Sequence, residues 1–482
     1  MNPQPNHRSR RLSQAAAALV LAGILIYGAA GRAGKKTPEG PGPVDTGWKN
    51  AGSVSVKANL SQTKVVQGSD GLVYLQVDLQ APEVTMDGGS RKPTDFVIVL
   101  DRSGSMADDR KMDYAKKAIG SLINQLKEGD RFALVDFDDV IETPIPLTGV
   151  SSGSKDTFRS RLSGIEPRNS TNIGGGLMAG IQVIQSAGRK SGQAQRLILL
   201  SDGLANVGVT DPSELGRIAE RAVSGEFAIS TIGVGLDFNE NLMSSLADHG
   251  MGNYTFLENL AVLDKVLAQE FYGASRIHAS GIKLTLDLAP GIEAVEASGY
   301  PVEKEDGKTV IRPGHLYVSQ KKTLFVTLRL PTDSLYTKPL GGASVSYSVG
   351  GNLQTVSLFG SELKVACLPM EKKAEAVASI APGVYKEAWT QNNYGKLMKD
   401  SADQVKSGNK EGALGAIRGY RAKLSEAYAA SPAPEMKKQL EELNRVESEV
   451  NDAFTGADAP EKSKRLSKSY QYQGTQQQRT SN

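Results

Sequence analysis

The sequence predicts a doubly wound α/β domain with a parallel sheet, inserted in or flanked by a β-sandwich and followed by a C-terminal α-helical hairpin or bundle. Three observations predict this fold class. Between residues 94 and 275, short continuous apolar runs, typical of strands covered on both faces, alternate with helical patterns. On both sides of this region apolar and polar residues alternate, as in strands with one exposed face. After residue 369 the composition shifts to Ala, Lys and Glu, which are all good helix formers.

Residues 1–33 are expected to be a signal peptide or a single membrane anchor. The basic segment "HRSRR" precedes the uncharged run "AAAALVLAGILIYGAAG" at residues 15–31. That run is at the short end for a membrane span, so both interpretations stay open. Either one sends the rest of the chain across the membrane, because the basic residues stay inside. We therefore expect a cell-envelope location, periplasmic or otherwise extracytoplasmic, with the protein anchored in the inner membrane or secreted.

A linker and two β-rich regions account for most of the remaining chain outside the α/β domain. Residues 34–50 are rich in Pro, Gly and charge and predict the linker. Residues 51–92 contain the alternating stretch "GLVYLQVDLQAP", and residues 276–368 contain "IKLTLDLAP", "TLFVTLRLP", "SVSYSVGG" and "LQTVSLF". The first group of strands is too small to bury a core alone. We therefore expect it to pair with the second group in one sandwich.

The elements of the α/β region follow from apolar spacing in order along the chain. Strands are expected at 95–100, 131–137, 196–201, 227–235 and 253–257, and helices at about 115–126, 172–185, 212–223, 239–250 and 260–271. One helix start is marked by Asp211 as N-cap and Pro212 in the first turn.

The C-terminal part is predicted to be helical over residues 369–455. Two helical patterns, 411–430 and 434–454, are separated by "SPAP" and indicate an antiparallel hairpin that packs with a helix around 384–405. Residues 456–482 are basic and rich in Gln, so we expect a disordered tail.

The overall composition excludes several classes of protein. Lys and Arg number 56 against 53 Asp and Glu, for a net charge of +3, so no nucleic-acid partner is expected. The single cysteine, Cys367, excludes a disulfide within the chain and a thiolate-rich metal site.

Carboxylate and hydroxyl side chains are placed where three strands or loops should meet. Asp101 ends the first α/β strand, and Ser103 and Ser105 follow it two and four residues later. Asp202 ends another strand, and Thr171 lies just before a helix. Ligands of open parallel sheets bind at the carboxyl ends of the strands, so these five side chains are expected to converge. An oxygen-only shell suits a hard divalent cation, Mg²⁺ first, with Ca²⁺ and Mn²⁺ as alternatives.

The segment "DRSGS", followed by Thr171 and by the Asp202 of "LSDG", resembles the von Willebrand factor A (vWA) domain and its metal-ion-dependent adhesion site. The resemblance covers about residues 94–275. It implies that Ser103 and Ser105 bind the ion, that Thr171 joins in the ligand-bound state, and that Asp202 orients the shell. The flanking regions resemble bacterial secreted or membrane-anchored members, some labelled as relatives of calcium-activated chloride channels or inter-α-trypsin inhibitor heavy chains.

This resemblance implies a non-enzymatic adhesion or scaffold module on the outer side of the cytoplasmic membrane, whose metal binds an Asp or Glu of an unknown partner protein. The alternative is a metal-dependent hydrolase. It is disfavoured because His249, His278 and His315 stand outside the metal loops and no G-x-S-x-G segment is present. An ion channel is disfavoured because one apolar segment cannot enclose a pore.

Overall fold

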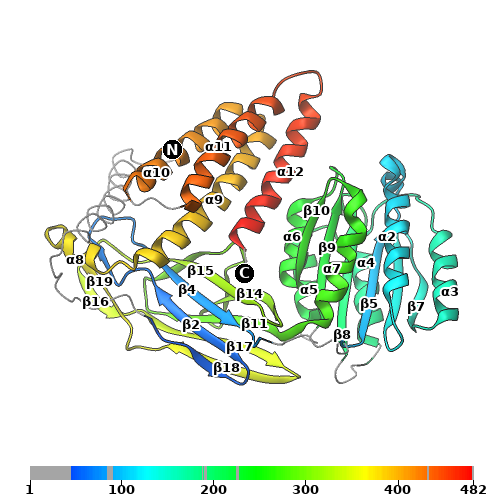
Figure 1. Cartoon of the computed structure of the whole chain (residues 1–482), viewed down its shortest axis with the longest axis horizontal. Coiled ribbons are helices and arrows are strands. Elements are labelled where there is room, and N and C mark those ends of the chain that lie inside the picture. Colours follow the sequence, from blue (N-terminus) through cyan, green and yellow to red (C-terminus); the bar gives the residue numbers. More distant parts are fainter. Residues whose placement is uncertain are drawn as a thin grey trace.

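The computed structural model describes residues 45–83, 91–186, 188, 193–223, 227–430 and 434–479. It contains a β-sandwich, an α/β domain at one end of the sandwich and a helical bundle over it (Figure 1). The predicted leader or anchor at 1–33 and residues 34–44 of the predicted linker lie outside the described residues. In the described part of the chain, none of the helices combines the length and the apolar character that a membrane crossing requires.

The α/β domain is built on a six-stranded sheet with the order β10-β9-β8-β5-β6-β7. All neighbours are parallel except the edge strand β7, which the sequence reading did not predict. Its strands are β5 (Thr94–Asp101), β6 (Arg131–Phe137), β7 (Ile141–Gly149), β8 (Ala194–Ser201), β9 (Ala228–Val234) and β10 (Met251–Leu257). Every residue of β5 is buried, as the continuous apolar run predicted.

Helices cover both faces of this sheet and give it two separate hydrophobic cores. One face carries α2 (Lys111–Gln125), α3 (Ser152–Ser163) and α7 (Leu263–Ser275). The other face carries α4 (Ile173–Ser186), α5 (Pro212–Val223) and α6 (Glu240–His249). The arrangement confirms the predicted doubly wound α/β domain, with α3 as an additional helix.

The β-sandwich consists of two five-stranded antiparallel sheets that enclose a common core. One sheet has the order β1-β2-β4-β15-β12 and the other β13-β14-β11-β17-β18, and a small third sheet has the order β16-β19-β3. The bounds are β1 (Lys49–Ala51), β2 (Val54–Leu60), β3 (Lys64–Val66), β4 (Leu72–Gln80), β11 (Ile277–Leu288), β12 (Glu293–Ala297), β13 (Glu303–Glu305), β14 (Lys308–Tyr317), β15 (Lys321–Arg329), β16 (Tyr336–Pro339), β17 (Gly341–Val349), β18 (Asn352–Phe359) and β19 (Lys364–Leu368).

The α/β domain is inserted into this sandwich. Strand β4, before the domain, pairs along its whole length with β15, after the domain. The N-terminal strands therefore complete the later β-region, as the sequence predicted. The last two residues of the predicted linker, Lys49 and Asn50, belong to strand β1.

The C-terminal region contains α8 (Lys373–Ala378), α9 (Pro382–Lys406), α10 (Lys410–Ala430), α11 (Pro434–Ala453) and α12 (Ala459–Gln478). The prediction of a disordered tail over residues 456–482 is wrong, because most of it forms α12, which packs along α9. Tyr470 is fully buried in the bundle core, and its hydroxyl group lies 2.9 Å from a carboxylate oxygen of Glu449. Few aliphatic residues are needed here, because buried tyrosine and paired lysine side chains supply the contacts.

Candidate metal site

The predicted site lies at the point where the strand order of the α/β sheet reverses. From the central strand β5 the chain first builds β6 and β7 on one side, then returns to build β8, β9 and β10 on the other. Asp101 is the last residue of β5, and Asp202 directly follows the neighbouring parallel strand β8. Loops diverge at such a switch point and leave space for a ligand.

Four of the five predicted residues form a continuous chain of hydrogen bonds. The backbone N–H of Ser103 donates to Oδ1 of Asp101 at 2.8 Å. The hydroxyl oxygens of Ser103 and Ser105 are 3.2 Å apart, and the Ser105 hydroxyl donates to Oδ1 of Asp202 at 2.8 Å. The tight loop after β5 therefore turns both serines toward the second aspartate.

The fifth residue, Thr171, approaches the same place through the backbone of Gly203. A Cβ atom added to Gly203 would lie 3.1 Å from Oγ1 of Thr171 and 3.5 Å from Oδ2 of Asp101. Asn206 fixes the threonine loop, because its Oδ1 accepts a hydrogen bond from the Thr171 N–H at 2.9 Å. The structure thus brings all five predicted side chains together.

Burial makes the metal-free arrangement electrostatically unfavourable. Both Asp101 and Asp202 are fully buried. Desolvation raises the pKa of Asp101 to about 6 and outweighs the opposing hydrogen bonds from Ser201 and Ser103, and the nearby Asp202 raises it further. A buried carboxylate with hydroxyl oxygens around it fits a hard divalent cation.

Two residues that were not predicted from the sequence contact the aspartates directly. The hydroxyl of Ser201, the last residue of β8, donates to Oδ2 of Asp101 at 2.5 Å. The buried ammonium group of Lys111 lies 2.6 Å from Oδ2 of Asp202. Asp202 is therefore held between Ser105 and Lys111, which suits an aspartate that orients the shell. Lys111 reaches it only because the chain between β5 and α2 turns back on itself.

Backbone hydrogen bonds join the loop after β5 to the loop that carries Thr171. The Arg168 N–H donates to the backbone oxygen of Arg102 at 2.7 Å, and the Gly104 N–H donates to that of Asn169 at 3.1 Å. The Arg168 side chain also binds the buried carboxylate of Asp138 at 2.7 Å. These contacts fix the spacing of the two loops before any ion binds.

Two glycines of α4 let this helix approach the sheet closely. A Cβ on Gly176 would lie 2.4 Å from the ring of Phe137, and one on Gly180 would lie 2.3 Å from Val99.

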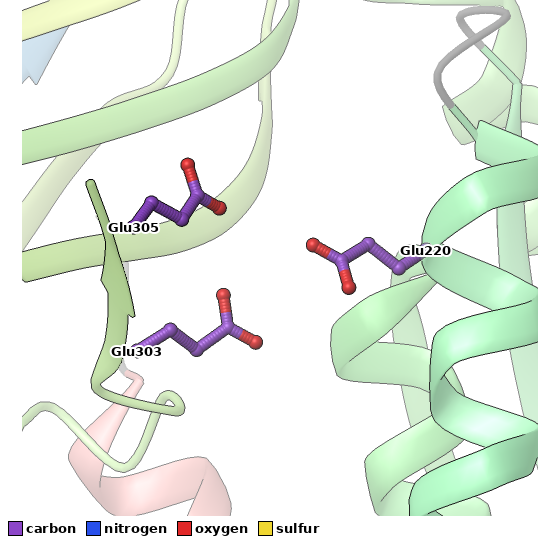
Figure 2. Close-up of side chains that lie close together, drawn as sticks. All are labelled: Glu220, Glu303 and Glu305. Atoms are coloured by element: carbon purple, nitrogen blue, oxygen red, sulfur yellow. The ribbon is translucent and has the colours of Figure 1, made fainter.

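A second group of carboxylates lies elsewhere, at the contact between the α/β domain and the sandwich. Glu220 of α5 faces Glu303 and Glu305 of β13 (Figure 2), and carboxylate oxygens of the three lie within 4.8 Å of one another. The guanidinium group of Arg312 forms ion pairs with all three. Arg312 therefore supplies positive charge to all three carboxylates, Lys283 also pairs with Glu305 at 2.6 Å, and the cluster joins the two domains.

The described histidines all lie away from the metal loops. His249 faces Glu303 at 3.4 Å, His278 is 2.7 Å from the hydroxyl of Ser53, and His315 is buried in the sandwich. None can serve as a general base at Asp101.

Comparison with known proteins identifies the α/β domain. Residues 95–269 match the family model of the von Willebrand factor type A domain. The chain therefore contains a vWA domain, and domains of this family are commonly metal-dependent protein-interaction modules. The match confirms the resemblance to the vWA domain.

Two curated relatives share this part of the chain. "Uncharacterized protein YfbK" from Escherichia coli (strain K12) is 29% identical over 198 residues, which cover 41% of this chain and 34% of YfbK. "Inter-alpha-trypsin inhibitor heavy chain H4" from Bos taurus is 27% identical over 191 residues, 39% of this chain and 19% of the relative. The matches thus span about a third and about a fifth of these relatives.

The fold beyond the vWA domain also has a counterpart among solved structures. "von Willebrand factor type A from Catenulispora acidiphila" has a TM-score of 0.59 and 16% sequence identity. The similarity covers 82% of this chain and 91% of that chain, so it extends past the α/β domain to the neighbouring domains.

Proposed function

We propose that this chain is a non-catalytic binding protein of the cell envelope whose vWA domain binds a partner protein through one divalent cation, Mg²⁺ in the first instance. Asp101, Ser103, Ser105, Thr171 and Asp202 hold the ion, which supplies a Lewis-acidic position for an Asp or Glu side chain of the partner. The observation that carries the proposal is the convergence of these five side chains around a fully buried aspartate at the sheet's switch point.

The protein's own side chains prepare the site before the partner arrives. Ser105 and Lys111 fix both oxygens of Asp202, and Ser201 and the Ser103 N–H fix those of Asp101. The loops therefore lose little conformational freedom on binding, which favours affinity. With two aspartates and one lysine in the shell, a bound divalent cation leaves a net positive charge, so an anionic group is preferred.

A binding role is favoured over hydrolysis by what surrounds the shell. A hydrolase needs a group that takes a proton from water. The described histidines lie elsewhere, and the hydroxyls of Ser103 and Ser105 are hydrogen-bonded to each other or to Asp202. The proposal specifies the partner protein by the Asp or Glu side chain that it presents to the ion.

Titration calorimetry with Mg²⁺ and Mn²⁺ tests the metal site. We expect one ion per chain in the wild type and none in Asp101→Asn. Asp113→Asn is the matched control, since it removes the same charge from an exposed aspartate on α2 whose one ion pair among the described residues is with the exposed Arg110. Equal metal binding by all three proteins would refute the assignment.

The proposed location has its own support and test. It is supported by the basic segment at 7–11 followed by the uncharged run at 15–31. A fusion of the chain to alkaline phosphatase, which is active only outside the bacterial cytoplasm, should be active, and deletion of residues 15–31 should abolish that activity. An active deletion variant would contradict the proposal.

A further inference from the structure

A pocket of about 670 Å³ adjoins the metal loops, and its walls come from distant parts of the chain. Ser105, Thr171 and Gly203 line it on the side of the metal site, and the loop that leads into α6 contributes residues 236–241. Four further lining residues belong to the C-terminal helices: Lys406 of α9 and Lys464, Ser467 and Lys468 of α12. Its volume is typical of a ligand-binding pocket.

Helix α12 is fixed against the vWA domain, so this wall is part of the folded structure (Figure 1). The buried ammonium group of Lys468 lies 2.7 Å from both the backbone oxygen of Phe238 and Oε2 of Glu240. One turn further along the helix, the ring of Tyr472 packs edge-on against that of Tyr254, with centroids 5.7 Å apart. The pairing with Glu240 offsets part of the cost of burying this lysine, although burial still lowers the pKa of its ammonium group.

The charges on this wall do not balance. The pocket is lined by three lysines but only two carboxylates, Asp237 and Glu240. Glu240 already has a buried partner in Lys468, so Lys406, whose side chain is 60% exposed, is a second cation on the same carboxylate. Burial raises the pKa of Glu240, but the two lysines outweigh it and bring the pKa to about 2.

Lys464 is also available to another anion. Its only ion pair in the described structure is with Asp237, and both side chains are about half exposed or more. Exposed pairs of this kind contribute about 0–1 kcal/mol, so a ligand carboxylate can replace Asp237 readily. Lys406 and Lys464 therefore both present an exposed ammonium group in the pocket next to the metal loops.

We propose that the C-terminal helices form the second half of the partner-binding site and that the partner segment carries two acidic side chains. This inference rests on the proposed function: one carboxylate binds at the metal loops, and the second binds Lys406 and Lys464. Charge complementarity selects an acidic peptide segment over a neutral one or one with a single acidic residue.

The test uses short capped peptides that contain either one Asp or an Asp and a Glu, with the spacing between the two varied. Binding to the full chain is measured by fluorescence anisotropy with Mg²⁺ and with chelator. At the best spacing, the two-carboxylate peptide should bind about tenfold more tightly than the single-Asp peptide. Lys406→Gln combined with Lys464→Gln should reduce the affinity for the two-carboxylate peptide much more than the affinity for the single-Asp peptide, so that the advantage is lost.

Lys396→Gln on α9 is the matched control, because Lys396 is exposed and pairs with Asp400 outside the pocket. Hydrogen exchange in α12 verifies that the variants keep the helix docked. If both peptides bind with Mg²⁺ but equally well at every spacing, the inference is wrong and the proposed function stands. If no peptide binds in a metal-dependent way, the proposed function and the inference fall together.

Discussion

Asp101 allows the electrostatic cost of the metal site to be measured. Its carboxyl group is fully buried, and its pKa rises from 3.8 to about 6, chiefly through desolvation. Each pKa unit corresponds to about 1.4 kcal/mol. The difference between about 6 and 3.8 therefore means that the ionised Asp101 destabilises the metal-free vWA domain by about 3 kcal/mol at neutral pH.

The pH dependence of this penalty has a definite sign. Because the pKa is higher in the folded state, the folded protein binds the proton more tightly than the unfolded chain. The penalty is absent below about pH 4, grows between about pH 4 and pH 6, and is complete above pH 6. A bound divalent cation should remove it, so affinity for Mg²⁺ should rise with pH through about 6 and then level off.

Asp101→Asn tests this reasoning, since it keeps the shape of the side chain and removes its charge. The Asn oxygen can still accept from the Ser103 N–H, and the Ser201 hydroxyl can accept from the new amide. In chelator at neutral pH, the variant should be more stable than the wild type by up to about 3 kcal/mol. Excess Mg²⁺ should stabilise the wild type and leave the variant unchanged.

The assay must report on the vWA domain itself, and the two tryptophans, Trp48 and Trp389, lie outside it. Hydrogen exchange of peptides from β5 and β8 in increasing urea provides that signal. Asp113→Asn should differ from the wild type by less than about 0.5 kcal/mol, because that aspartate is exposed. An Asp101→Asn variant that is less stable than wild type in chelator would refute the argument.

Three further changes should have measurable effects on stability. Gly176→Ala should destabilise the vWA domain by about 1–3 kcal/mol, since its Cβ would meet the Phe137 ring; Gly120→Ala in α2, with open space around it, should be neutral or slightly stabilising in the same urea titration. Lys468→Met should increase hydrogen exchange throughout α12, because it removes a buried cation from a buried carboxylate, at a cost of about 3 kcal/mol. Arg312→Gln should destabilise the joint between the domains at neutral pH. The effect should shrink as the pH falls below the ordinary range of a glutamate, because the lowered pKa values of Glu303 and Glu305 mean that their ion pairs are lost only on acidification; thermal unfolding at neutral and at acid pH would show this.

The sequence was sufficient to predict the vWA sheet and the convergence of five polar side chains at its edge for a physical reason. Strands covered on both faces must be continuously apolar, so "DFVIVL" and "RLILLS" mark their own ends. Parallel strands in one sheet end at the same edge, so the polar residues that follow them, Asp101 and Asp202, must be close. For Asp101 and Asp202, the apolar pattern of the strands and the parallel topology of the sheet predict the same location.

Lys111 and α12 could not be predicted in this way, because their roles depend on contacts between distant segments. Lys111 lies six residues after Ser105 in a stretch whose backbone includes positive φ angles at Asp109 and Arg110, and this turn directs its side chain to Asp202. Helix α12 is polar in composition and gains its stability only when Tyr470 and Lys468 become buried against other elements. Composition alone indicates disorder in such a segment.

The contrast between the vWA domain and the C-terminal helices also indicates which residues determine binding specificity. The family match ends at residue 269, and the five metal-site residues lie within it. The four lining residues on the C-terminal helices, including Lys406 and Lys464, lie well beyond it. Under the function and the second site proposed above, the shared domain supplies a general preference for a carboxylate, and the helices that close the pocket add a requirement for a second negative charge. A partner of this chain should then be distinguished from ligands of other vWA domains by the spacing of its two acidic residues.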